Sequence, residues 1–208
     1  MRIAVVGAGS VGATVGQAWI ERGEDVIWGV RNPADSKYAA LPRERVKTAA
    51  DAAKGAEVVV TATPWSAAQA AIKSLGSLAG KIVIDCMNPL AIRNGRLALD
   101  RGFDTSGAEA LARWVPGARI VKTLNQVGAE MMENNSVLPH RPVMFMAGDD
   151  PAAKSAVAAL LTDLGFEALD AGDLTKARLL EPFAMVWINQ ALIQGKGRDW
   201  AFAAMAPS

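Results

Sequence analysis

The stretch Val5-Val6-Gly7-Ala8-Gly9-Ser10-Val11-Gly12 decides the fold of this 208-residue chain. It carries a G-x-G-x-x-G pattern between a β-branched run, Ile3 to Val6, and an alanine-rich stretch, Val11 to Arg22, whose composition favours helix. A strand before the glycines and a helix after them is the context in which this pattern is informative. The stretch therefore predicts the first βα turn of a dinucleotide-binding unit.

Each glycine of the pattern has a physical role in such a turn. Gly7 permits the tight turn, Gly9 lets the backbone approach a pyrophosphate, and Gly12 lets helix and strand pack closely. The first turn of the helix offers free N–H donors to the anion. The alternative is a glycine-rich turn without a ligand, and the position directly after the first strand favours the dinucleotide site.

The end of the second predicted strand, Asp25 to Gly29, indicates which dinucleotide is bound. An acidic residue there would accept the ribose 2′-OH of NAD, but the chain has Arg31 at that point. A guanidinium can grip a 2′-phosphate and stack on adenine, so we expect NADPH, with Asn32 as a weaker donor. Lys37 and Arg43 either add charge to this site or belong to an ordinary solvated loop.

Strand-like and helix-like segments alternate through the chain, which predicts an α/β Rossmann-type fold: a doubly wound, mainly parallel sheet. We expect mixed strands on the C-terminal side, a terminal helix from Thr175, and a kink or fresh start at Pro182. The predicted domains are an NADP-binding domain, 1–148, and a small α/β extension packed on it, 149–208. The further predicted strands are 57–62, 81–85, 119–123, 142–147 and 167–170, and the further helices 49–54, 66–75, 107–114 and 151–164.

Composition excludes several classes of partner. A formal net charge of +1 provides no field for nucleic acid or a membrane surface. The single cysteine, Cys86, and the single histidine, His140, provide neither an internal disulfide nor a zinc cluster. The apolar run at the N-terminus is too short for a signal peptide. We therefore expect a cytoplasmic protein without a metal.

Further motifs extend the resemblance to a family. They are Thr61-Ala62-Thr63-Pro64-Trp65, Asp85-Cys86-Met87-Asn88-Pro89, Lys122-Thr123-Leu124-Asn125 and Leu169-Asp170-Ala171-Gly172. With the glycine pattern and Gly29-Val30-Arg31, they make the chain resemble, nearly end to end, the NADP oxidoreductases dependent on coenzyme F420, a deazaflavin. That family is also similar to the reductase domain of membrane ferric reductases. The resemblance implies hydride transfer between NADP and the deazaflavin or a flavin-type acceptor.

The resemblance also implies the site residues. Gly9, Ser10, Val11, Arg31, Pro64 and Trp65 would line the NADP site, and the deazaflavin would lie near Asn88, Pro89 and Asn125. Two departures matter. Val30 replaces the usual Ser or Thr before the arginine, which removes a phosphate hydroxyl, and Gln126 replaces a Thr beside the acceptor pocket.

The loops that carry these residues are expected to meet at a single crevice. Ligands of parallel sheets bind beyond the carboxyl ends of the strands, where Thr63, Pro64, Trp65, Asn88 and Asn125 are expected to emerge. Trp65 could instead cap the sheet by packing, and both asparagines could only close turns. We assign no catalytic acid or base, because hydride transfer between two cofactors needs mainly their alignment.

Two other functions stay open. One is an NADPH-dependent reductase of a small hydroxyacid or imine, although such enzymes usually have a longer helical C-terminal domain and a proton donor. The other is a non-catalytic NADPH-sensing module that contacts a partner protein. The apolar residues of the terminal helix also suggest a homodimer.

Overall fold

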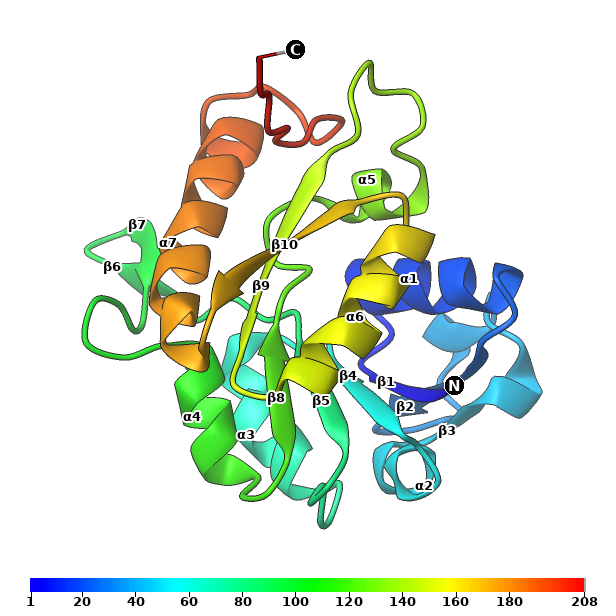
Figure 1. The fold of residues 1–208 in the computed structure, drawn as a ribbon. Coiled ribbons are helices and arrows are strands. Elements are labelled where there is room, and N and C mark those ends of the chain that lie inside the picture. The colour runs from blue at the N-terminus through cyan, green and yellow to red at the C-terminus, as the bar shows by residue number, and fades with distance from the viewer. Residues whose placement is uncertain (208) are drawn as a thin grey trace.

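The computed structural model describes residues 1–207 and has an eight-stranded sheet with helices on both faces (Figure 1). The strands are β1 (Arg2–Val6), β2 (Asp25–Val30), β3 (Val46–Thr48), β4 (Val58–Thr61), β5 (Ile82–Asp85), β6 (Leu90–Arg93), β7 (Arg96–Leu99), β8 (Arg119–Lys122), β9 (Val143–Gly148) and β10 (Glu167–Gly172). The α-helices are α1 (Ser10–Glu21), α2 (Ala49–Lys54), α3 (Trp65–Lys73), α4 (Gly107–Trp114), α5 (Ala129–Glu133), α6 (Pro151–Asp163) and α7 (Ala177–Ile188).

The sheet has the order β10-β9-β8-β5-β4-β1-β2-β3 and is parallel from β8 to β3. β9 runs antiparallel to β8, and β10 runs parallel to β9. The predicted doubly wound sheet with mixed strands on its C-terminal side is confirmed. The chain leaves β1 toward β2 on one side and returns to β4 on the other, so a crevice for a ligand is expected at the carboxyl end of β1.

Two apolar layers hold the helices to the sheet. On one face α1, α5 and α6 pack on the strands, with Trp19 and Phe166 among the fully buried side chains. On the other face α2, α3 and α4 pack on the strands through small residues and a few large ones, such as Ile72 and Leu111. These strands are buried on both faces, which explains their continuous apolar sequences.

Some local predictions were incomplete or wrong. No strand was predicted at 90–99, where β6 and β7 form a hairpin that projects beyond α7 (Figure 1). The short strand β3 was also missed. Of the two expectations for Pro182, a kink or a fresh start, the fresh start is wrong, because α7 runs from Ala177 to Ile188 with Pro182 inside it. Pro182 has no backbone N–H, so α7 lacks one hydrogen bond there. The domain boundary at 148/149 falls between β9 and α6 and stays a prediction; Ser208 lies outside the described residues.

Candidate dinucleotide and acceptor site

The glycine-rich turn after β1 has the shape that a pyrophosphate requires. Gly7 has a φ of +102°, and a Cβ there would lie 2.5 Å from the carbonyl oxygen of Ala62. A Cβ on Gly12 would lie 2.0 Å from the carbonyl oxygen of Gly7. By contrast, a Cβ on Gly9 would meet no atom within 4 Å. Two glycines are thus needed for packing, while Gly9 faces open space.

The start of α1 faces that same space without a side-chain cap. Gly9 is the N-cap residue, and no side chain accepts a hydrogen bond from the first turn of α1. The first N–H groups of a helix have no partner inside it, and the helix dipole favours an anion there. This turn therefore fits the pyrophosphate of a dinucleotide.

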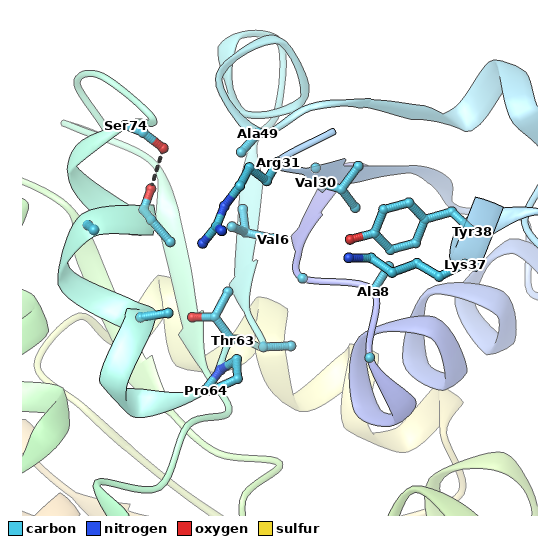
Figure 2. A pocket seen from close by; sticks show the side chains of 17 residues that line it. Val6, Ala8, Val30, Arg31, Lys37, Tyr38, Ala49, Thr63, Pro64 and Ser74 are labelled. Atoms are coloured by element: carbon cyan, nitrogen blue, oxygen red, sulfur yellow. Dashed lines mark hydrogen bonds between the residues drawn. The ribbon is translucent and has the colours of Figure 1, made fainter. Parts of the chain in front are cut away.

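A cavity of about 550 Å³ opens on the β2 side of this turn (Figure 2). Arg31 reaches into it from the end of β2, and the terminal atoms of Lys37 and Tyr38 face the same space from the following loop. It is lined by Val6, Gly7, Ala8, Gly9, Gly29, Val30, Arg31, Lys37, Tyr38, Ala49, Ala62, Thr63, Pro64, Ala67, Ala70, Ala71 and Ser74. Two cations beside the second strand suit the 2′-phosphate of NADPH.

The two cations differ in their surroundings. Lys37 Nζ lies 3.0 Å from Asp35 Oδ2 and 4.9 Å from the centre of the Tyr38 ring. The hydrogen bond to Asp35 holds the pKa of Lys37 above its usual value. Arg31 makes no ion pair among the described residues. Arg31 is therefore the cation that is ready for an incoming phosphate.

Two residues considered for this site do not line the cavity. Asn32 is exposed and closes a turn, in which its Oδ1 accepts a hydrogen bond of 3.1 Å from the N–H of Ala34. Arg43 lines a separate, smaller hollow that is formed largely by the same loop. Tyr38 was missed by the sequence analysis, although an aromatic residue next to Lys37 was a usable signal for an adenine contact.

A second cavity, of about 460 Å³, adjoins the first. The two cavities share Gly9, Ala62, Thr63 and Pro64, so they are parts of one crevice across the end of β1 and β4. The second is lined by Gly9, Ser10, Val11, Ala62, Thr63, Pro64, Trp65, Ser66, Cys86, Met87, Asn88 and Leu90. The loops after β1, β4 and β5 therefore converge, as their positions in the sequence predict.

Trp65 has both a packing contact and a place in the second cavity. Its ring stacks on Trp114 with the centroids 5.4 Å apart, and its Nε1 donates a hydrogen bond of 3.1 Å to Asp100 Oδ2. Arg101 lies 5.4 Å from the ring centre. The indole thus joins α3 to the loop that follows β7, and one wall of the cavity depends on this contact.

Asn88 and Asn125 are a reciprocal pair, but only Asn88 lines the cavity. Asn88 Nδ2 donates a hydrogen bond of 2.9 Å to the carbonyl oxygen of Asn125. In return, Asn125 Nδ2 donates a hydrogen bond of 3.0 Å to Asn88 Oδ1. Asn125 is 6% exposed and supports Asn88 from behind. Pro89 is buried and lines neither cavity.

The described lining of the second cavity carries one ionisable side chain, the thiol of Cys86. Burial raises the pKa of this thiol, so it stays protonated and is a poor nucleophile. His140 is exposed on a loop, and no cluster of metal-ligating side chains occurs among residues 1–207. The second cavity thus suits a ring that brings its own chemistry.

Comparison with known proteins agrees with this geometry. Residues 2–89 match the sequence profile of the family described as NADP oxidoreductase, coenzyme F420-dependent. The crystal structure of a candidate F420-dependent NADP reductase from Arthrobacter sp. FB24 is 35% identical and superposes with a TM-score of 0.91, covering 99% of this chain and 100% of that one. The chain belongs to the coenzyme F420-dependent NADP oxidoreductase family. It is an NADP(H)-dependent oxidoreductase.

Two further proteins are more distantly similar to this F420-dependent NADP oxidoreductase, one in sequence and one in fold. Metalloreductase STEAP3 of Rattus norvegicus is 27% identical over 180 residues, which are 86% of this chain and 36% of the metalloreductase. The chain thus spans about a third of that relative. A reductive aminase from Aspergillus terreus is 18% identical with a TM-score of 0.65 over 93% of this chain and 62% of the aminase, which shows a shared fold. Within residues 1–207, no helix combines the length and apolar character needed to cross a bilayer.

Proposed function

We propose that the enzyme transfers hydride between NADPH in the first cavity and a deazaflavin or flavin-type acceptor in the second. The observation that carries this proposal is the sharing of Gly9, Thr63 and Pro64 by both cavities. A nucleotide that crosses the glycine-rich turn from Arg31 ends beside the second cavity. The volume of the second cavity, about 460 Å³, lies in the range of sites that bind a cofactor-sized ring.

The lining of the second cavity also favours an acceptor that is itself a cofactor. NADPH and a deazaflavin supply the electronic chemistry of hydride transfer, so the protein needs to hold them and exclude water. Apart from the protonated thiol of Cys86, the described lining offers hydroxyl, amide, aromatic and aliphatic groups but no acid or base. A reductase that acts on a small imine, or that reduces an oxoacid to a hydroxyacid, would need a proton donor there.

The acceptor is tested by mixing the purified protein with NADPH and, separately, with oxidised deazaflavin, FMN, FAD and a ferric chelate. Loss of nicotinamide absorbance is followed in each case. Rapid oxidation with the deazaflavin supports the proposal, and oxidation only with a flavin moves the acceptor within the same class. Oxidation by the ferric chelate alone would contradict the proposal and point to the chemistry named for the metalloreductase relative.

The proposal would also be contradicted if none of the acceptors oxidised NADPH although NADPH bound tightly. A panel of small imines and 2-oxoacids then separates a small-substrate reductase from an NADPH-sensing module. Turnover of one of these compounds would identify the reductase. Binding without any turnover would favour the sensing module.

We also propose that the enzyme is a cytoplasmic homodimer. The lone thiol of Cys86 is buried and free, which suits a reducing compartment. Three exposed apolar side chains recur every seven residues along α7 and the π-helical turn after it (Asn189–Ile193). They are Leu179, Val186 and Ile193, which are 63%, 51% and 62% exposed. An apolar stripe of this spacing can pack on its own copy across a twofold axis.

A further inference from the structure

Three charged side chains are buried together behind the second cavity. Asp85 and Lys122 are 0% exposed and Glu181 is 1% exposed. Lys122 Nζ lies 3.1 Å from Asp85 Oδ2 and 3.3 Å from Glu181 Oε1. A buried ion pair is weak evidence of stability, because desolvation offsets much of the attraction. The position of this cluster is therefore more informative than its energy.

The cluster lies at the carboxyl ends of two central strands. Asp85 is the last residue of β5 and Lys122 the last of β8, and the two are partners in the parallel register. Their side chains point to the face that α3 and α4 cover, because Val83 and Ile120, two residues earlier, pack there. This is the end of the sheet at which the crevice opens.

Both backbone polar groups of Met87 end in this cluster. The Lys122 ammonium donates a hydrogen bond to the Met87 carbonyl oxygen, and the Met87 N–H donates one of 3.0 Å to Asp85 Oδ1. Met87 lines the second cavity between Cys86 and Asn88. The cluster thus fixes the main chain of that wall from the side that faces away from the cavity.

Glu181 connects the same wall to α7. Its carboxylate accepts hydrogen bonds of 2.9 Å and 3.1 Å from the N–H groups of Gly107 and Ala108, at the start of α4. The carbonyl oxygen of the neighbouring residue, Leu180, accepts a hydrogen bond of 3.1 Å from Asn125 Nδ2, which belongs to the amide that supports Asn88. Two successive residues of α7 therefore hold the wall, one through Lys122 and one through Asn125.

The electrostatics keep the cluster together. Burial opposes the charge of Lys122, but Asp85 and Glu181 outweigh it and hold the pKa of Lys122 above its usual value. Burial raises the pKa of Glu181, while Lys122 and the N–H groups of α4 oppose that rise. Removing Lys122 would leave two buried carboxylates without their cation, so the wall would rearrange. Glu181→Gln would replace one carboxylate oxygen by an NH2 donor, which would face the Lys122 ammonium or an N–H group of α4 without an acceptor.

We infer that Lys122, held by Asp85 and Glu181, is the positioning residue for the Cys86–Asn88 wall of the second cavity, so that α7 sets the shape of the acceptor site. The inference rests on the proposed function in taking this cavity as the acceptor site. Neither Lys122 nor Glu181 lines either cavity. They act through Met87 and not on the reacting atoms.

The test uses Glu181→Gln, which keeps the shape of the side chain, and Lys122→Met. Glu109→Gln is the matched control, because the Glu109–Arg178 pair also joins α4 to α7 but does not touch the wall. Four quantities are measured on each folded variant: the rate at which a disulfide reagent modifies Cys86, the Kd of NADPH, and both kcat and KM for the acceptor. Cys86 is the single cysteine, so its modification reports on this wall alone.

We expect Glu181→Gln to raise the rate of Cys86 modification at least about tenfold over Glu109→Gln, because the wall opens more often. The KM for the acceptor rises, while the Kd of NADPH changes by less than about twofold. Equal Cys86 rates in Glu181→Gln and the control would overturn the inference, as would a parallel loss of NADPH affinity. The thiol and NADPH measurements need no acceptor, so they decide the inference even if deazaflavin turnover fails. If Lys122→Met does not fold, Glu181→Gln decides alone.

Discussion

The indole Nε1 of Trp28 donates a hydrogen bond of 2.9 Å to the carbonyl oxygen of Gly12. This contact ties the middle of β2 to the first turn of α1, directly behind the glycine-rich turn. The Trp28 ring also fills the space beside Gly16, where a Cβ would lie 2.7 Å from ring atoms. The position of the nucleotide-binding turn thus depends on a tryptophan that does not line either cavity.

Two glycine substitutions should separate packing from binding. Gly12→Ala places a methyl group against the carbonyl oxygen of Gly7, so we expect a loss of about 3 kcal/mol or more in the free energy of unfolding. Gly9→Ala meets open space and should cost about 1 kcal/mol or less, the scale of an N-cap change. Denaturant unfolding measures both.

Gly9→Ala should have little effect on the free energy of unfolding but a large effect on NADPH binding. Its methyl group occupies the space that a pyrophosphate needs, so NADPH affinity should fall at least about tenfold. Fluorescence titration with NADPH measures this. Wild-type affinity in Gly9→Ala would mean that the pyrophosphate does not cross this turn.

Arg31→Ala should change the choice of dinucleotide. Loss of charge-assisted hydrogen bonds to a 2′-phosphate should weaken NADPH binding about tenfold to hundredfold, with little effect on NADH. Arg43→Ala is the matched control, since it removes a cation from the same loop outside the cavity. Equal losses for NADPH and NADH in Arg31→Ala would contradict a phosphate contact.

Trp65→Phe should affect the acceptor and spare the nucleotide. It removes the hydrogen bond to Asp100 and part of the wall of the second cavity. We expect the KM for the acceptor to rise about threefold to tenfold, the effect of one lost hydrogen bond, at a nearly unchanged Kd of NADPH. Steady-state kinetics with the accepted deazaflavin or flavin measures this. Trp114→Phe, which changes the stacking partner outside both cavities, should leave that KM near the wild-type value.

Acid should weaken the contact between α4 and α7. The hydrogen bond from Arg178 to Glu109 holds the pKa of that carboxyl below its usual range. A carboxyl group whose pKa is lowered by folding stabilises the fold at pH values above its ordinary pKa of about 4.3. This contribution is lost as the pH falls through the pKa of the folded state. Glu109→Gln should therefore cost about 1 kcal/mol at pH 7, because Arg178 is partly solvated, and the difference from wild type should shrink below about pH 4. Unfolding curves at pH 7, 5 and 3.5 measure this; a constant difference would show that the ion pair contributes no pH dependence.

The proposed dimer can be tested on α7. Val186→Asp places a carboxylate in the exposed apolar stripe, so a dimer that uses this face should dissociate to monomers at micromolar concentration. Light scattering after gel filtration measures the mass. A monomeric wild-type protein, or an unchanged dimer in the variant, would exclude this interface.

The sequence predicted the sheet well because its strands have continuous apolar runs separated by alanine-rich helices. The β6–β7 hairpin was missed, although Asn94-Gly95 between the two strands is a strong hairpin signal. Both residues have positive φ, +52° and +71°, as a type I′ turn requires. The strands β6 and β7 themselves carry arginines and half-exposed residues, so their apolar pattern is weak.

The candidate site was predictable only where a local motif carries it. The glycine pattern and Arg31 are local signals, and the structure places Gly7, Gly9 and Arg31 at one crevice. The contact of Lys122 with Glu181 depends on α7 crossing α4, and nothing in the neighbouring sequence indicates it. Asn125 was predicted near the acceptor because of its position after a strand, but its side chain turns to Asn88 and away from the cavity.

The two edges of the large sheet have a consequence for aggregation. At one edge β3 has only three residues, too few to template another strand. At the other, the register of β10 shifts between Asp170 and Gly172, and Asp170 is paired with Lys154 at 2.7 Å. A charged, irregular edge and a very short one both resist the addition of a foreign strand. Concentrated protein should therefore associate through helix faces and not by extending the sheet into fibrils.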